Sequence, residues 1–309
     1  MLDPFEVLAG VKQGCVLAPV IFNLFLVAVT LVFRNELSTD AGIPFKYRLD
    51  GSVFNLRRLQ AQTKVSTDTV YELQYADDAA LPSHSPSGLQ DNLNALADAY
   101  HRAGLIINTK KTEILSPIQS PSSQLTFTVH GDTLNTTQQF TYLGSILSSD
   151  SDLTNEIQQR VKLASSAFGR LGNRVFFNRN LTVSTKVAVY KAICLSILLY
   201  GCESWIPYRR HIKALEAYHI RCLQSILGIR WWHRKTHTEI RDSAKIEPIE
   251  LLLLQRQLRW LGHVIRMPSN RLPRRLFYGE LLLGKRPVGR PKLRYSDHIK
   301  SALRKMQHP

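Results

Sequence analysis

The hydrophobic periodicity of the sequence changes near residue 150, and this change constrains the fold more than any other feature. Before it, apolar and aromatic residues gather in short runs between turn-forming residues, such as residues 69–75, which is typical of β-strands. After it, apolar residues recur every three or four positions, as at Ile157, Val161 and Ala164, which is typical of amphipathic helices. We therefore expect an α+β fold in which a mixed region is followed by a helical one.

Residues 15–33 form an uncharged apolar stretch about as long as a bilayer requires. Pro19, Asn23 and Thr30 interrupt the stretch, and no basic segment precedes it as in a signal peptide. A buried core helix explains it as well as a membrane span does. We favour the core helix and expect the protein not to be transmembrane.

The four cysteines, Cys15, Cys194, Cys202 and Cys222, show no paired C-x-x-C spacing. We interpret them as free thiols in a reducing compartment and not as ligands of a zinc knuckle. Nothing in the sequence suggests secretion, so its N-glycosylation sequons are interpreted as chance matches. The expected location is intracellular, in the nucleus or the cytoplasm.

The positive charge is concentrated at the C-terminal end. The chain has a formal net charge of +16, and residues 230–309 hold 19 Lys and Arg against 6 Asp and Glu. Such a field attracts polyanions, either nucleic acid or anionic lipid headgroups. Many of these basic residues are Arg among Trp and Tyr, which favours nucleic acid as the partner over a membrane.

The adjacent carboxylates Asp77 and Asp78 carry the most chemical information. Neighbouring residues on a strand point to opposite faces, so both can reach one metal only where the strand turns, as at a hairpin tip. Oxygen ligands suit Mg²⁺, and nucleotidyl transfer with two metals needs a further carboxylate to bridge them. On its own, an Asp-Asp dipeptide also fits a solvated turn.

The neighbouring segments favour the metal site over the plain turn. Four segments, taken in order, resemble motifs of the reverse transcriptase palm of LINE-type (non-LTR) retrotransposons: Gly10 to Pro19, Tyr75 to Asp78, Gly104 to Glu113, and Phe140 to Ser145. Residues 198–205 and 259–264 resemble the thumb and post-thumb regions of the same elements. The resemblance covers essentially the whole chain.

The resemblance implies a role for individual residues. Asp77 is then the principal metal ligand, Asp78 a secondary one, and Lys111 the general acid that protonates the pyrophosphate. The contacts to substrates are assigned to Gln13 and Gly14 for template and nucleotide, and to Tyr142, Leu143 and Gly144 for the primer end. The intact family enzyme holds two Mg²⁺ ions and uses an RNA template, a DNA primer and deoxynucleotides.

The fold implied is a partial right-hand polymerase palm with a catalytic β-hairpin, a helical thumb and a basic C-terminal helix-and-loop region. The expected domains are the palm at 1–116, a primer-grip hairpin region at 117–150, the thumb at 151–228 and the basic region at 229–309. The family motif with the bridging Asp lies well upstream of Gln13, and so do the fingers. Asp3 is too close to Gln13 to replace that Asp, so we expect these residues alone to lack polymerase activity.

Two alternatives stay open beside a fragment of a reverse transcriptase. One is a non-catalytic remnant that binds nucleic acid through the thumb and the basic region. The other is a chain that never folds stably, because its palm sheet lacks a partner strand and exposes strand edges and apolar surface.

The basic region contains two candidate nucleic-acid contacts. A helix beginning after Pro248 would carry Arg256, Arg259, His263 and Arg266 on one stripe, which suits phosphate contacts or simply a solubilising face. The segment with Arg286, Arg290 and Lys292 is similar in part to the AT-hook, which lies in narrow minor grooves. Trp231, Trp232 and Trp260 are interpreted as core residues. From Met267 onward, little regular structure is expected until a short helix after Ser296.

Overall fold

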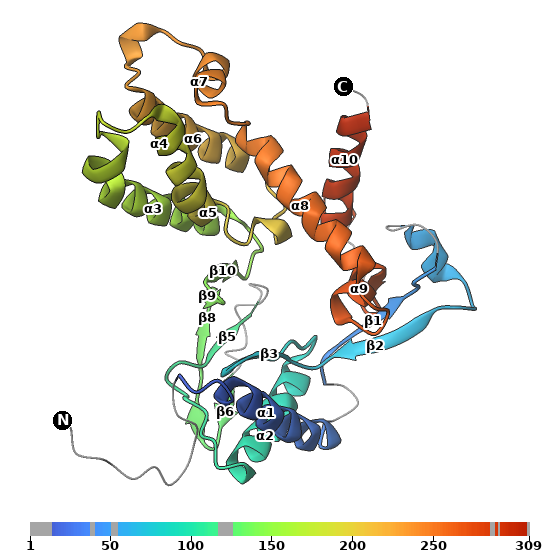
Figure 1. Ribbon diagram of the computed structural model, residues 1–309. Helices are drawn as coiled ribbons and strands as arrows, with labels where there is room; N and C mark the ends of the chain where they lie inside the picture. The colour runs from blue at the N-terminus through green and yellow to red at the C-terminus, as the bar shows by residue number, and fades with distance from the viewer. Residues whose placement is uncertain are drawn as a thin grey trace, which may run out of the picture. The chain divides into compact units, whose positions relative to one another are not determined.

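The chain divides into two compact units in the computed structural model. The structure describes residues 14–37, 41–50, 55–116, 126–284, 288–289 and 291–307. Unit 1 comprises Met1–Ile114, Gln119–Thr137 and Tyr278–Gly284, and unit 2 comprises Leu115–Ile118, Gln138–Phe277 and Lys285–Pro309. Small sheets and several helices make a mixed α+β fold, which is the class that the sequence predicts (Figure 1).

Unit 1 contains short strands in small sheets. Its strands are β1 (Ile43–Tyr47), β2 (Ser66–Val70), β3 (Leu73–Tyr75), β4 (Asp78–Ala80), β5 (Glu113–Leu115), β6 (Thr128–Val129), β7 (Asp132–Thr133), β8 (Asn135–Thr137) and β11 (Gly279–Leu281). The largest sheet has the order β11-β1-β2, and the pairs β3-β4, β5-β8 and β6-β7 form two-stranded sheets. At the centre of the first sheet, the buried Phe45 lies opposite Asp68 and Leu281.

The described residues of unit 1 also form two helices and a short 3₁₀ turn: α1 (Ala18–Asn35), α2 (Pro86–Arg102) and η1 (Leu56–Gln60). The hydroxyl of Ser85 caps α2 by accepting the Gly88 N–H at 3.1 Å, and Pro86 occupies its first turn. One face of α2 packs against apolar residues of β5, β6 and their connections, and another packs against α1. Helix α2 therefore joins the two apolar clusters of this unit.

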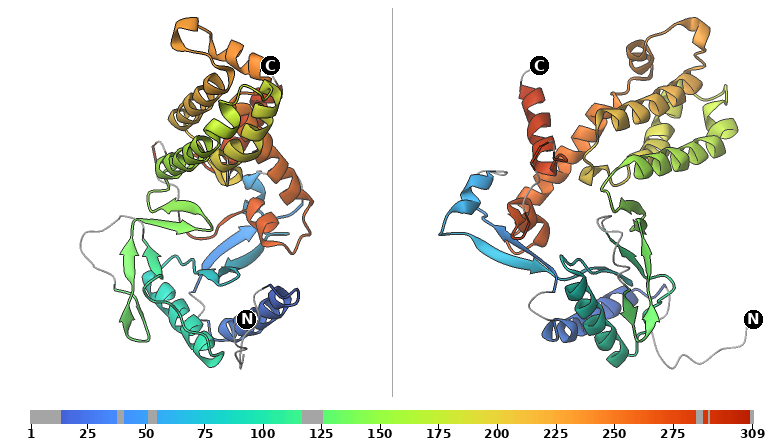
Figure 2. Two further views of the ribbon diagram at one scale, coloured as in Figure 1. Left: turned by 60° about the vertical axis from the view of Figure 1, so that its left-hand side comes forward. Right: turned by 180° about the vertical axis from the view of Figure 1, so that it is seen from behind.

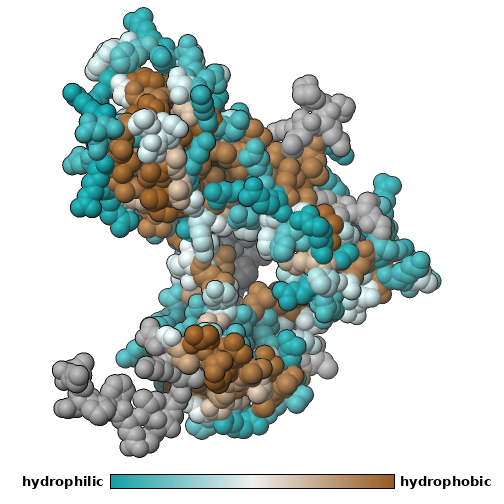
Figure 3. Space-filling model, viewed as in Figure 1, coloured by the Kyte–Doolittle hydropathy of each residue, from teal (hydrophilic) through white to brown (hydrophobic). Residues whose placement is uncertain are grey.

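Helix α1 lies largely exposed on unit 1, so the prediction of a buried core helix was wrong. Of its residues, only Leu26, Val29 and Phe33 are buried. The apolar side chains of the opposite side form the patch seen over α1 in Figure 3: Val20, Leu24, Val27, Leu31 and neighbouring residues. By length and composition alone α1 could cross a membrane, a test that core helices of soluble proteins also pass. An apolar surface of this extent is typical of a face that another molecule covers.

Unit 2 is almost entirely helical. Its helices are α3 (Thr154–Leu171), α4 (Val183–Val189), α5 (Leu195–Leu198), α6 (Arg209–Leu227), α7 (His237–Ala244), α8 (Ile249–Arg266), α9 (Leu272–Phe277) and α10 (Tyr295–Gln307), with shorter turns η2 (Gly172–Phe176), η3 (Tyr190–Cys194), η4 (Cys202–Ser204) and η5 (Trp231–His233). One hairpin, β9 (Gln139–Tyr142) with β10 (Ser145–Ser148), precedes α3. The helical periodicity predicted after residue 150 is confirmed.

The core of unit 2 lies between α3, the α4-to-α5 segment and α6. It contains the fully buried Tyr190 and Leu223 together with three cysteines, Cys194, Cys202 and Cys222, all free thiols. Burial raises the pKa of Cys194 and Cys202 to about 12, so these thiols stay protonated and unreactive.

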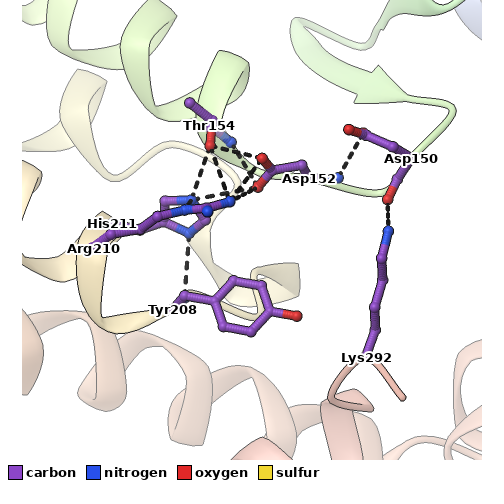
Figure 4. A network of polar contacts seen from close by, with 7 residues as sticks. All are labelled: Asp150, Asp152, Thr154, Tyr208, Arg210, His211 and Lys292. Atoms are coloured by element: carbon purple, nitrogen blue, oxygen red, sulfur yellow. Dashed lines mark hydrogen bonds and ion pairs between the residues drawn. The ribbon is translucent and has the colours of Figure 1, made fainter. Parts of the chain in front are cut away.

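Polar contacts fix the loop between β10 and α3 to the first turn of α6 (Figure 4). The Tyr208 N–H donates to Nδ1 of His211 at 3.2 Å, and Nε2 of the same ring lies 3.2 Å from Oγ1 of Thr154 and accepts the Arg210 Nε–H at 3.1 Å. Thr154 in turn donates to Asp152, which also accepts two contacts of 2.8 Å from Arg210. Burial alone would raise the pKa of Asp152, but these hydrogen bonds lower it. The loop is thereby held at the start of α3.

Acidification from pH 7 to pH 4 is expected to destabilise unit 2 by about 3 kcal/mol through His219. Nδ1 of this buried residue lies 2.9 Å from the Tyr190 hydroxyl, and burial lowers its pKa to about 4. The unfolded chain binds the proton near pH 6.5, so stability is full above that pH and falls by about 1.4 kcal/mol per pH unit below it. Urea unfolding at several pH values measures this loss. The variant His219→Gln should show a smaller pH dependence, and an unchanged one would contradict the prediction.

Candidate functional site

The acidic pair lies at the tip of the β3–β4 hairpin. Tyr75 pairs with Asp78, so the two-residue turn consists of Ala76 and Asp77. Ala76 has φ of +53°, a position where such turns favour glycine, and a non-glycine residue there stores about 1 kcal/mol or more of strain. Asp77 and Asp78 are both exposed. The hairpin tip predicted from the sequence thus presents two adjacent carboxylates to solvent.

Side chains of α1 and α2 hold this hairpin in place. Gln74 of β3 accepts a hydrogen bond from the Thr30 hydroxyl at 3.0 Å and donates one to the Tyr100 hydroxyl at 2.9 Å. Just before β3, the buried side chain of Glu72 forms an ion pair of 3.0 Å with Arg34. Burial raises the pKa of Glu72, and Arg34 opposes this rise. The carboxylate turn therefore projects from a strand fixed on both sides.

The acidic turn can supply part of a metal site. No group of three or more His, Cys, Asp or Glu side chains is placed to hold a metal among the residues that the structure describes. Two exposed carboxylates suit a hydrated Mg²⁺, but a two-metal centre needs at least one more carboxylate between the ions. Asp77 and Asp78 therefore fit only a fraction of such a centre.

Of the other residues predicted for the palm, the structure places Lys111 and Gly14 but does not describe Gln13. Lys111 is exposed in the turn before β5, and the Asn108 side chain accepts its backbone N–H at 3.2 Å. Gly14 is exposed, has φ of +85° and lies four residues before α1. Gln13 lies outside the described residues. Unit 1 thus contains Gly14, Asp77, Asp78 and Lys111.

The predicted primer-grip residues form the turn between β9 and β10, in unit 2. Tyr142 pairs with Ser145, so Leu143 and Gly144 are the two turn residues. Both have positive φ, +48° and +78°, as a type I′ hairpin turn requires. Leu143 is a strained position for a branched apolar residue, and its side chain is 40% exposed.

A buried ion pair behind this turn holds it, and the sequence analysis missed it. Arg160 of α3 forms an ion pair of 2.6 Å with Glu156, and both side chains are almost fully buried. Arg160 also donates to the Gly144 carbonyl, and Glu156 accepts the Ile146 N–H at 2.7 Å. The signal available was the i,i+4 spacing of Glu156 and Arg160 directly after the hairpin, which is common on exposed helices and therefore weak.

Tyr200 contacts the same turn from the α5 side of unit 2. The Arg160 guanidinium lies 4.6 Å from the centre of its ring, within the range of a cation–π contact. The Tyr200 hydroxyl donates to the Leu143 carbonyl at 3.1 Å. Backbone carbonyls of both turn residues are thus bound by side chains, which leaves the Leu143 side chain to face solvent.

The predicted nucleic-acid contacts of the basic region differ in their surroundings. Arg256 is half-buried and donates to the Leu199 carbonyl at 3.2 Å, whereas Arg259 and Arg266 are exposed on α8. Lys292 donates to the Asp150 carbonyl (Figure 4). Arg286 and Arg290 lie outside the described residues.

The tryptophans predicted to be core residues are not buried. Trp231 is 84% exposed, Trp232 58% and Trp260 38%. Only Trp205, with 3% exposed, lies in the core of unit 2.

The chain is similar to one protein family and to two known proteins. Residues 3–147 match the family described as reverse transcriptase (RNA-dependent DNA polymerase). The chain is 26% identical over 249 residues to a transposon-derived protein of Caenorhabditis elegans, across 78% of this chain and 88% of that protein. It is 23% identical over 238 residues to the RNA-directed DNA polymerase from the mobile element jockey of Drosophila melanogaster, across 75% of this chain. The chain spans only 23% of the length of that polymerase.

Proposed function

We propose that this chain contributes the metal-binding turn and the primer-seating turn to RNA-templated DNA synthesis, because residues 3–147 match the reverse transcriptase family and the chain is similar to the polymerase of the non-LTR element jockey. The observation that carries the proposal is the pair of exposed carboxylates on a strained hairpin fixed between α1 and α2. In this proposal residues 1–116 belong to the palm, 117–150 to the primer-grip region, 151–228 to the thumb and 229–309 to the basic region.

The proposed roles of the residues follow the chemistry of their groups. The family uses Mg²⁺, which stabilises the charge on the attacking and leaving oxygens. Asp77 and Asp78 would bind the ion directly through their carboxylates. Lys111, an ammonium on a flexible stem, would give a proton to the departing pyrophosphate. The turn of Leu143 and Gly144 would seat the primer end, because its backbone is held while the leucine side chain stays accessible.

We expect a polypeptide of residues 1–309 alone not to extend a primer. The described residues provide two of the carboxylates, and two-metal transfer requires more. The assay is incorporation of deoxynucleotides on an RNA template with an annealed DNA primer and Mg²⁺. The positive test is a chimera in which residues 3–147 replace the matching segment of the jockey polymerase, and this chimera should extend the primer. A chimera that binds template and primer without extension would contradict the proposed function.

A second candidate is a non-catalytic protein that binds nucleic acid through unit 2. The exposed Arg259 and Arg266 on α8 and the concentration of basic residues after residue 229 favour it. This second candidate predicts that nucleic-acid binding weakens steeply with rising salt and that even the chimera does not extend a primer.

A further inference from the structure

The segment between α6 and α7 exposes two neighbouring tryptophans. We call residues 229–236 the tryptophan loop; it forms an outer end of unit 2 in all three ribbon views (Figures 1 and 2). The exposed fractions are 84% for Trp231 and 58% for Trp232. Tryptophan is normally among the most buried side chains by area, so two adjacent exposed ones indicate a contact surface.

The exposure belongs to an ordered loop. Gly228, with φ of +66°, ends α6, and the Ile229 N–H then donates to the Gln224 carbonyl at 2.9 Å. The Arg230 N–H donates to Nδ1 of His233 at 2.9 Å and closes a 3₁₀ turn around both tryptophans. At the other end, Thr236 forms a capping box with α7. The loop is therefore fixed at both ends and at its centre.

The two indole rings contact each other edge to face, with centroids 5.7 Å apart and planes at 82°. Trp232 also contacts the ring of His233, with centroids 5.8 Å apart, which fits its lower exposure. An edge-to-face contact covers less flat surface than a stacked one, so most of the Trp231 ring stays accessible. Flat aromatic faces are what nucleobases stack on, whatever the base.

The positive charge around Trp231 and Trp232 indicates what kind of partner they bind. Arg230, Arg234 and Lys235 lie within six residues, and no acidic residue occurs from Gly228 to Thr238. Neither Arg230 nor Arg234 forms an ion pair with any other described residue. Cationic groups beside accessible aromatic faces match the alternation of phosphates and bases in a nucleic-acid strand. A single strand fits better than a duplex, because duplex bases are already stacked and paired.

We propose that the tryptophan loop binds single-stranded nucleic acid. Trp231 and Trp232 stack on bases, and Arg230, Arg234 and Lys235 contact the phosphates. The loop lies outside the segment that matches the reverse transcriptase family, so this is a second contact with the strand, separate from the two turns of the proposed function. The proposed function makes such a strand available, but binding itself requires neither metal nor nucleotide.

The test is the affinity of the complete 309-residue chain for a labelled oligo(dT) of 20 nucleotides, measured by fluorescence anisotropy without nucleotides. Trp231→Leu keeps an apolar side chain but removes the aromatic face, and it should weaken binding about tenfold. Trp231→Phe keeps an aromatic face and should retain most of the affinity. Arg234→Gln should lower the slope of log K against log salt, while Lys213→Gln, at an exposed position on α6, serves as the matched charge control.

Several results would overturn the proposal. Trp231→Leu with unchanged affinity, or Leu and Phe variants that lose affinity equally, would show that no base stacks on this ring. If Trp231→Leu instead reduced binding to vesicles of phosphatidylcholine and phosphatidylserine and left oligo(dT) binding intact, the loop would be a membrane contact. Equal thermal unfolding of all variants excludes misfolding as the cause. Because extension is not measured, failure here and failure of the chimera are separate outcomes.

Discussion

Arg160→Met is expected to destabilise unit 2 by about 3–5 kcal/mol, because it removes one partner of a buried ion pair. The Glu156 carboxylate would remain buried with the Ile146 N–H as its remaining donor among the contacts described above, and the Gly144 carbonyl would lose the guanidinium. Urea unfolding of the full chain, followed by far-ultraviolet circular dichroism, gives the free energy of unfolding for unit 2.

Two further variants separate the ion pair from simple side-chain loss. Arg170→Met changes an exposed arginine of the same helix and should shift the free energy of unfolding by less than about 0.5 kcal/mol. Glu156→Gln combined with Arg160→Met removes both charges and should recover much of the loss, since a neutral pair has no uncompensated charge. If Arg160→Met and Arg170→Met had equal effects, the ion pair would not stabilise the turn. Hydrogen exchange at the Ile146 amide reports on the turn itself.

Asp77→Asn in the jockey chimera is expected to reduce primer extension by about a thousandfold or more. An amide keeps the size of the side chain and one oxygen, but it lacks the negative charge that binds a hydrated divalent ion. Losing metal stabilisation of the transferring phosphoryl group costs several kcal/mol in the barrier, and each 1.4 kcal/mol corresponds to a factor of ten in rate. The measurement is the initial rate of deoxynucleotide incorporation at saturating Mg²⁺.

The matched control for this variant is Asp98→Asn on α2, which also removes one exposed carboxylate of unit 1. It should leave the rate within about twofold. Asp78→Asn should give a rate of primer extension between those of the Asp77 and Asp98 variants, since Asp78 is proposed as a secondary ligand. Equal rates for the Asp77 and Asp98 variants would remove the acidic turn from catalysis and with it the proposed function.

The local features of the fold could be predicted from the sequence, whereas features that depend on distant partners could not. The signals that set α2 are local: the Ser85 cap, Pro86 in the first turn and the helical spacing of Leu93 and Leu96. The acidic turn is equally local, since Tyr75 to Asp78 close a two-residue hairpin. The Glu156–Arg160 pair was missed because burial of that helix face depends on the β9–β10 hairpin packing against it.

The errors at α1 and at the tryptophans have the same physical origin. Apolar periodicity shows that α1 has an apolar surface, but it does not show whether anything covers that surface. Trp231 and Trp232 were assigned to the core on their residue type alone, although the arginines around them are hard to bury. For a residue type with both apolar and polar character, the neighbours in space determine whether the side chain is buried or exposed.

Little regular structure was expected between Met267 and Ser296, because this segment contains many Pro, Gly and Arg residues, but the structure has helix α9 and strand β11 there. The strand depends on a distant partner. It pairs with β1 across more than two hundred positions of sequence, and only such distant pairing gives it a strand conformation. This pairing has a consequence for biosynthesis. During translation the β1–β2 hairpin forms long before β11 is synthesised. One edge of β1 therefore stays unpaired until nearly all the later helices have left the ribosome. A ribosome that stalls before residue 279 therefore releases a protein with a bare strand edge, open to pairing with a neighbouring chain.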